Sequence, residues 1–301
     1  MTVGRFIRNT FILTGVMLAV WAFLSGIATG VFGEIAPESQ TPVATLIFFA
    51  VVLANVLVYE WYILRSNAYG RRLSLILFLL IFGVIFFMTQ IETLVFNDAI
   101  GMPVALIIAL IVAGVVVAGA VSPLAVRLFK KQKPESAVIS RPPLWKGSAF
   151  ELAWKLTALS LLYVLFYVLF GYLIAWQFPA LREFYSGSTE LVGFLQQWAN
   201  TIKADPILPL LQIFRGYLWA GLALLATRTI DTVRRWERLT IVGLLMSIGL
   251  SLPILLPNPY MPAAVRYGHF PELFIENFLF GVIAGLLFTR VTSKDTGNKV
   301  D

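Results

Sequence analysis

Residues 103–126 read PVALIIALIVAGVVVAGAVSPLAV, a stretch in which no Asp, Glu, Lys or Arg occurs. A helix needs about 20 mostly apolar residues to cross the roughly 30 Å of hydrocarbon in a bilayer. This stretch is long enough to do so, and seven other runs of the chain have the same character. We therefore predict an all-α, polytopic integral membrane protein with eight transmembrane helices, at about residues 10–32, 43–64, 73–96, 103–126, 150–176, 208–227, 239–256 and 271–289.

The composition of the whole chain supports the same interpretation. Of the 301 residues, 59% are hydrophobic and only 13% are charged, and the mean hydropathy is +0.84. A soluble domain usually carries about 25% charged residues. Too few polar side chains remain to cover a water-exposed surface, so we expect the lipid bilayer to surround the protein. The first run is longer than the apolar part of a signal peptide, and we predict a retained helix.

The charges in the loops predict the orientation. Of the 23 Lys and Arg residues, 18 lie in the terminal segments and connections on the side of the N-terminus, and three lie on the opposite side: Arg182, Lys203 and Arg266. Basic loops stay in the cytoplasm. We therefore expect both termini to be cytoplasmic, in a cell (inner or plasma) membrane. The net charge of +7 has the same origin, and we expect no nucleic-acid partner.

A basic segment at residues 133–147 divides the chain into a first four-helix half (1–132) and a second one (148–301). Pro134, Pro142 and Pro143 lie in this segment, which predicts a cytoplasmic surface linker. Each half holds an even number of spans, so a tandem duplication would give a 4+4 repeat with parallel halves.

Three pairs of residues hint at such a repeat. Arg72 opens the third span as Arg238 opens the seventh; Pro42 and Pro209 begin the second and sixth; and Pro103 and Pro271 begin the fourth and eighth. Their separations are 166 to 168 residues. Proline is common at the start of any helix, so unrelated halves would also fit.

The longest outer connection contains an amphipathic pattern at about residues 189–203. Apolar residues recur there at helical spacing, with polar residues between them: Leu191, Phe194, Leu195, Trp198 and Ile202. We expect a short helix, which either lies in the outer membrane interface or packs over the mouth of the bundle.

Six ionisable residues fall within the predicted spans: Glu60, Glu92, Glu151, Lys155, Arg215 and Glu276. Each costs roughly 2.5–3.5 kcal/mol on insertion scales and calls for a reason. We expect structural roles for Glu60, Glu151 and Lys155, which lie near the cytoplasmic ends of their helices. Glu151 and Lys155 can also reach the headgroups. The spacing of Glu151 and Lys155 also predicts an ion pair.

The other three residues lie in the outer half of the membrane, on helices that are not neighbours in sequence. Arg215 shares a helix face with Gln212, and it is too deep to reach water easily. We expect its guanidinium to pair with a carboxylate, first Glu276 and second Glu92. Either this cluster locks the bundle together, or it lines a site that opens to the outer face, where Arg215 would attract an anionic group.

His269 is predicted to lie above this cluster, after the proline-rich residues 257–262. It is the single histidine of the chain. Loop and interface histidines are common, but an imidazole at this position is suited to gate a site or relay protons near neutral pH.

Several chemistries are excluded or unsupported. The chain has no cysteine and one histidine, so we expect no metal and no cofactor. Motifs of hydrolases, zinc proteases and nucleotide-binding proteins are missing. The sequence therefore favours transport or binding of a small polar or amphiphilic solute at Glu92, Gln212, Arg215, Glu276 and His269. The alternatives are an outer-face lipid-modifying enzyme and an accessory subunit of a membrane complex, which would bind through Gly281 and Gly285.

Overall fold

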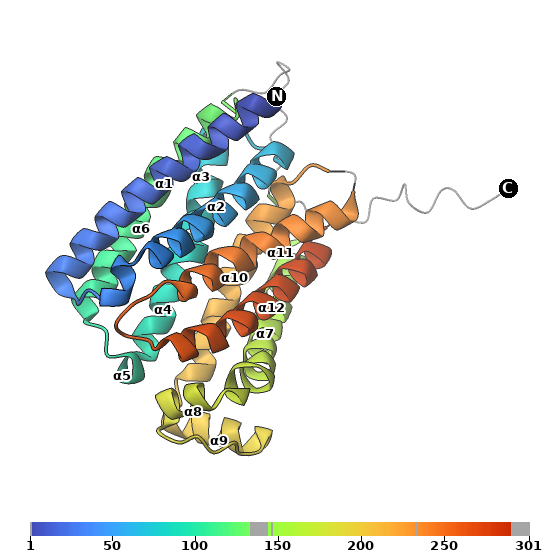
Figure 1. Cartoon of the computed structure of the whole chain (residues 1–301). Helices are drawn as coiled ribbons and strands as arrows, with labels where there is room; N and C mark the ends of the chain where they lie inside the picture. Colours follow the sequence, from blue (N-terminus) through green and yellow to red (C-terminus); the bar gives the residue numbers. More distant parts are fainter. Residues whose placement is uncertain (1, 133–143, 146, 233, 290–301) are drawn as a thin grey trace.

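The computed structural model describes residues 2–132, 144–145, 147–232 and 234–289. Over these residues, eight helices are long and apolar enough to cross a membrane, which confirms the predicted fold class (Figure 1). The spans are α1 (Val3–Phe32), α2 (Pro42–Arg65), α3 to α4 (Gly70–Val95), α6 (Val104–Leu128), α7 with η3 (Ala149–Gln177), α10 (Leu208–Thr229), α11 with η4 (Arg235–Leu255) and α12 (Ala263–Phe288). Most of the predicted linker lies outside the described residues.

Short elements occupy the connections at one end of the bundle. They are η1 (Pro37–Gln40), α5 (Asn97–Ile100), α8 (Pro179–Ser186) and α9 (Phe194–Ala204). Figure 1 shows α5, α8 and α9 at the end opposite to the start of α1. We call their end the outer end and the other the inner end, after the predicted orientation, which itself stays a prediction.

Polar caps begin two of the spans. The side chain of Thr41 accepts a hydrogen bond from the backbone N–H of Ala44 at 3.2 Å, and Pro42 occupies the first turn of α2. The side chain of Ser148 accepts from the N–H of Glu151 at 3.0 Å at the start of α7. These bonds satisfy N–H groups that a helix start leaves free.

The two halves share three helix contacts, and the second half adds contacts of α10 with α12 and with α11. In each half the first span packs on the second and on the fourth, and the third packs on the fourth: α1 with α2 and α6, α3 with α6, α7 with α10 and α12, and α11 with α12. Between the halves, α2 packs on α11 and α10 packs on α3. A duplication predicts this arrangement, although the duplication itself stays a prediction.

A two-residue antiparallel bridge joins the halves at the inner end. Ser66 follows α2 and Ile230 follows α10, and these residues pair with each other. The N–H of Asn67 donates to the carbonyl of Thr229 at 2.8 Å, and the N–H of Asp231 donates to the carbonyl of Arg65 at 2.6 Å. The ends of the second spans of both halves are thereby fixed to each other.

The eighth span begins earlier than predicted. Pro271 was expected at its start, but it lies inside α12, which begins at Ala263. A proline inside a membrane helix is tolerated where neighbouring groups satisfy the freed carbonyl. The match between Pro103 and Pro271 is therefore wrong, because Pro103 directly precedes α6.

A π-helical turn, η2 (Phe82–Phe87), interrupts the third span between α3 (Gly70–Ile81) and α4 (Met88–Val95). Such a turn inserts an extra residue and rotates everything that follows it. Phe86 from this turn packs against Gly114 of α6, where a Cβ atom would lie 2.4 Å from the ring. The turn therefore decides which way the polar residues of α4 face.

Glycines allow two close helix contacts. Gly281 of α12 lies on Gly243 of α11, where an added Cβ would be 2.8 Å from the Gly243 Cα. Gly216 of α10 lies against Ser160 of α7, where an added Cβ would be 2.7 Å from the Ser160 Cα.

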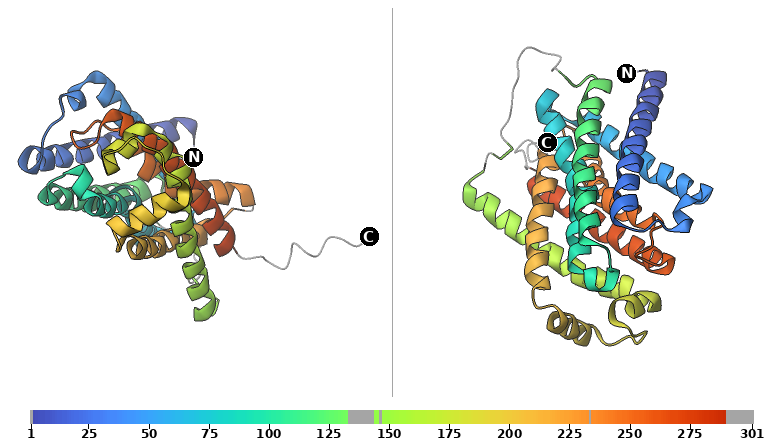
Figure 2. Two further views of the ribbon diagram at one scale, coloured as in Figure 1. Left: turned by 90° about the horizontal axis from the view of Figure 1, so that it is seen from below. Right: turned by 90° about the vertical axis from the view of Figure 1, so that its left-hand side faces the viewer.

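The fifth span and α9 lie at the edge of the bundle. Both views of Figure 2 show α7 projecting from the other spans, and among its residues only Leu159, Ser160 and Tyr163 are buried. The predicted amphipathic helix forms as α9, which begins at Phe194 rather than near residue 189. In α9, the ring of Trp198 contacts the ring of Tyr167 on α7, while 79% of Leu195 is exposed.

Candidate functional site

The centre of the site is an ion pair between the two halves of the chain. Nη2 of Arg215 on α10 lies 2.9 Å from Oε2 of Glu92 on α4. Only 1% of the Arg215 side chain is exposed, against 25% of the Glu92 side chain. The prediction that Glu276 is the first partner of Arg215 is therefore wrong, because the register of α4 after the π-helical turn brings Glu92 to the guanidinium.

Two further residues hold the guanidinium. Gln212, one turn before Arg215 on the same helix face, accepts a hydrogen bond from Nη1 at 2.9 Å. The ring of Tyr163 on α7 lies 5.6 Å from the Arg215 Cζ, within the range of a cation–π contact. The amino groups that face Glu92 and Gln212 are thus already bound to protein.

Glu276 on α12 is buried beside this pair. Its exposed fraction is 1%, and no hydrogen bond or ion pair joins it to any residue that the structure describes. The charges of Glu272, Glu92 and Arg215 reach it. We call Glu92, Gln212, Arg215 and Glu276 the outer cluster.

Buried donors in the outer cluster are also unsatisfied. Within the described part of the chain, Nε2 of Gln212 and Nε of Arg215 have no hydrogen-bond partner. Buried polar atoms are rarely left so, and each such atom points to bound water or a ligand. The outer cluster therefore combines an unpaired acid with free donors at one depth.

His269 lies next to the outer cluster and bridges two other residues. Its Nδ1 is 2.7 Å from Oε2 of Glu272, and its Nε2 is 3.0 Å from the hydroxyl of Tyr185 on α8. Burial, together with the charges of Glu92 and Glu272, raises the pKa of Tyr185 well above its ordinary value. The phenol therefore stays protonated. We call Tyr185, His269 and Glu272 the His269 bridge.

The sequence did not point to Tyr185 or Tyr163. Tyr185 belongs to α8, an eight-residue helix that we did not predict, although Pro179 at its start is a typical signal. Tyr163 lies in an apolar run rich in aromatic residues, where spacing alone does not indicate which ring faces a cation. Glu272 lies one helical turn before Glu276, and its spacing alone does not identify His269 as its partner.

The ionisable residues at the inner end have separate roles. The expected pair of Glu151 and Lys155 is confirmed, with 2.8 Å between Oε1 and Nζ. Glu60 is fully buried, on the side of α2 that faces α1. There Thr10 donates a hydrogen bond to its Oε2 at 2.8 Å.

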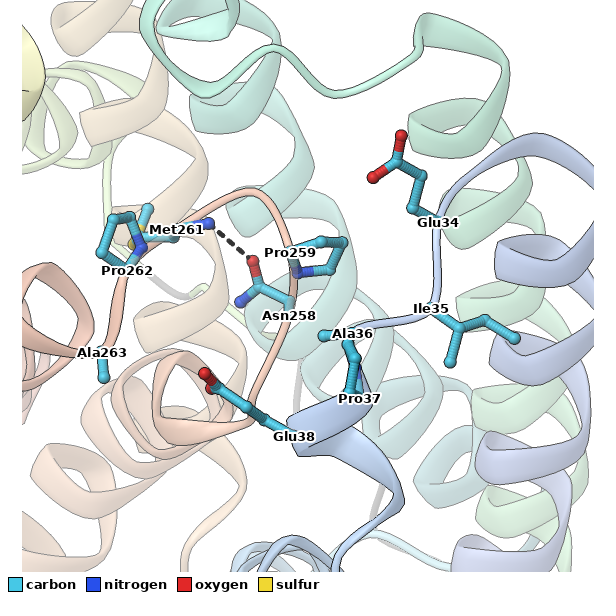
Figure 3. A pocket seen from close by; sticks show the side chains of 10 residues that line it. All are labelled: Glu34, Ile35, Ala36, Pro37, Glu38, Asn258, Pro259, Met261, Pro262 and Ala263. Carbon is cyan, nitrogen blue, oxygen red and sulfur yellow. Dashed lines mark hydrogen bonds between the residues drawn. The ribbon is translucent and has the colours of Figure 1, made fainter.

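A cavity of about 310 Å³ opens at the outer end between the two halves, away from the outer cluster. It is lined by residues 34–38 and by Asn258, Pro259 and residues 261–263 (Figure 3). The Asn258 side chain accepts a hydrogen bond from the N–H of Met261 at 3.0 Å. Since 72% of the Glu38 side chain is exposed, the cavity lacks the buried, unpaired groups that distinguish the outer cluster.

Among the described residues, no group of three or more His, Asp or Glu side chains is placed to hold a metal ion. Comparisons with family models, with curated proteins and with solved structures found no match to this chain.

Proposed function

We propose that this protein binds a small polar solute at the outer cluster and carries it across the membrane. The observation that supports this proposal most strongly is Glu276, which is fully buried without a partner among the described residues. A buried charge left unpaired costs several kcal/mol. An occupant that neutralises it, either a proton or a cationic group, is therefore favoured.

The charges around Glu276 favour a cationic solute. The carboxylates of Glu272 and Glu92 and the guanidinium of Arg215 all act on Glu276, so the acids there outnumber the one positive charge. Both Nη atoms of Arg215 already donate to Gln212 and Glu92, and its positive charge is paired with Glu92, so only its Nε remains for a hydrogen bond to the solute. The proposal therefore replaces the anionic group expected from the sequence with an ammonium group, which Glu276 would bind.

The position of the cluster between the halves supports transport rather than binding alone. Glu92 comes from the first half, while Gln212, Arg215 and Glu276 come from the second. In transporters built from repeats, the solute binds at the interface between the repeats, and their relative motion opens it to alternate sides. Movement of one half against the other would break the pair of Arg215 and Glu92.

The test uses the purified protein in detergent and a panel of small amines, namely ethylamine, ethanolamine, choline and putrescine, with acetate and succinate as anionic controls. A ligand present at about 100 times its Kd stabilises a protein by about 2.7 kcal/mol. We expect at least one amine to raise the Tm of the wild type and neither anion to do so.

The same measurement on Glu276→Gln should lose the effect of the amine. The matched control is Glu183→Gln, because Glu183 is an exposed acid of α8; it should keep the effect. A panel without any active amine, or an equal effect on Glu276→Gln, overturns the proposal. Uptake of the active, radiolabelled amine into proteoliposomes then separates transport from binding.

One observation favours a second function, a lipid-modifying enzyme. The His269 bridge places an imidazole between a hydroxyl and a carboxylate, an arrangement suited to general acid–base catalysis, and α9 exposes Leu195 at the same end. Incubation of the protein with defined phospholipids, followed by mass spectrometry, tests it. A new lipid product that His269→Phe no longer forms would favour the enzyme.

A further inference from the structure

We propose that the His269 bridge is a proton relay, which leads from the outer surface to Glu276. This inference rests on the proposed function of the outer cluster, since it identifies the proton as the ion that shares the site with the solute. Two observations support it. Both ring nitrogens of His269 are hydrogen-bonded, and the exposed fraction decreases from His269 to Glu272 and from Glu272 to Glu276.

The residues of the relay follow one face of α12. His269, Glu272 and Glu276 are separated by three and four residues, which places them one above the other along a helix. The side chains of His269 and Glu272 are 18% and 7% exposed, and Glu276 is 1% exposed. The order of the three groups is thus also their order of depth below the outer surface.

The hydrogen bonds of the His269 bridge fit two protonation states equally well. In the first, the hydroxyl of Tyr185 donates to Nε2, and Nδ1–H donates to the Glu272 carboxylate. In the second, Nε2–H donates to the Tyr185 oxygen, and a protonated Glu272 donates to Nδ1. A tyrosine hydroxyl both donates and accepts, so neither state leaves a ring nitrogen unpaired.

Passage between these states moves one proton inward. A proton from outer water binds Nε2, where it replaces the hydrogen bond from Tyr185 and creates an imidazolium. The imidazolium then gives its Nδ1 proton to Oε2 of Glu272. One proton has entered at Nε2 and one has left at Nδ1, and the ring is again neutral as its other tautomer.

The next transfer is from Glu272 to Glu276, one turn deeper on α12. Neighbouring carboxylates repel each other when both are charged, so such a pair readily shares a proton. The other groups facing Glu276 are Glu92 on α4, Arg215 on α10 and Tyr163 on α7. The charged residues of α11 lie at its inner end, at residues 235–238, and do not face the relay.

The single histidine of the chain allows a direct test. With ¹⁵N-labelled histidine, every ring-nitrogen signal of the protein comes from His269. We expect the wild type in nanodiscs to show both neutral tautomers in exchange. Tyr185→Phe removes the acceptor for Nε2–H, so we expect that variant to hold the Nδ1–H tautomer alone.

The same signals test the link to Glu276. Glu276→Gln removes the acid behind Glu272, so a proton that reaches Glu272 can pass no further. We expect the ratio of the two tautomer signals to change by about twofold or more in this variant. Glu183→Gln is the control and should leave the ratio unchanged. A single fixed tautomer in the wild type, or an unchanged ratio in Glu276→Gln, overturns the relay.

A second measurement follows the proton itself. After light-triggered proton release outside the nanodisc, time-resolved infrared spectroscopy should show a carboxyl band that is lost in Glu276→Gln. We expect this band to rise at least tenfold more slowly in His269→Phe, and an equal rate contradicts the relay. Neither measurement needs a solute, so a failed relay leaves amine binding at Glu276 intact, and a failed amine panel leaves the relay to be judged separately.

Discussion

Nη2 of Arg215 and Oε2 of Glu92 lie 2.9 Å apart, although 123 residues separate them in the chain. Between them lies the whole linker, so this buried contact can form only when the two halves are packed together. The pair therefore has two roles. It holds the two halves together, and it shapes the site beside Glu276.

Neutralising one partner of the pair should destabilise the protein. We expect Glu92→Gln to lower the free energy of unfolding by about 3 kcal/mol, since it leaves the guanidinium of Arg215 buried without its counter-charge. Reversible unfolding in mixed micelles of increasing SDS content measures this change. The double variant Glu92→Gln with Arg215→Gln should lose less than the sum of the single variants; simple additivity would show that the pair contributes no coupling.

The contact of α11 with α12 depends on the absence of a side chain at Gly281. A Cβ there would lie 2.8 Å from both the Gly243 Cα and the Val242 carbonyl oxygen. We expect Gly281→Ala to destabilise the protein by about 1–3 kcal/mol in the same unfolding assay. Gly221→Ala in α10 is the control, because nothing lies within 4 Å of its Cβ position; equal effects of the two changes would be evidence against the close contact.

Glu60 depends on Thr10 for its hydrogen bond. Thr10→Val removes the donor to its Oε2 and should cost about 1–3 kcal/mol of stability, because a buried acceptor is then left unpaired. Thr14→Val, one turn further along α1, is a matched control, since the hydroxyl of Thr14 is buried without a partner among the described residues. We expect the control to be neutral or stabilising, and the reverse order of the two effects would contradict the contact.

The predicted orientation can be checked with cysteines, since the natural chain has none. We expect Ser188→Cys, between α8 and α9, to react with a membrane-impermeant maleimide on intact cells. Gln132→Cys, an exposed residue beyond α6, should react only after the cells are opened. The opposite pattern of labelling would invert the orientation.

The spans could be predicted because they follow from composition, whereas the site depends on helix register. Residues 103–126 carry no charged side chain. An apolar run of this length is typical of a membrane span. By contrast, the π-helical turn at Phe82–Phe87 has no clear signature among apolar residues, and it rotates Glu92 toward Arg215. Pro271 indicated a helix start where α12 in fact continues through it, so the first turns of α12, which carry His269, were assigned to a loop.

The sequence also did not predict which side chains of the site contact each other. Gln212 and Arg215 were predicted to share a face because both lie on one helix, and they do. The contact of His269 with Tyr185 joins α12 to an eight-residue helix, and it depends on how the outer connection folds back. Contacts of this kind are decided by tertiary packing, which single-sequence spacing does not contain.

The bridge between Ser66 and Ile230 has a consequence for the origin of the protein. Its two backbone bonds are reciprocal, from the residue after Ser66 to the one before Ile230 and from the residue after Ile230 to the one before Ser66. An antiparallel bridge always has this reciprocal form, and its bonds need no covalent connection between the halves. The predicted duplication would imply that a four-span ancestor made such a contact with a second copy of itself, as a homodimer. Co-expression of residues 1–132 and 148–301 as separate polypeptides should accordingly yield a complex that purifies as a pair.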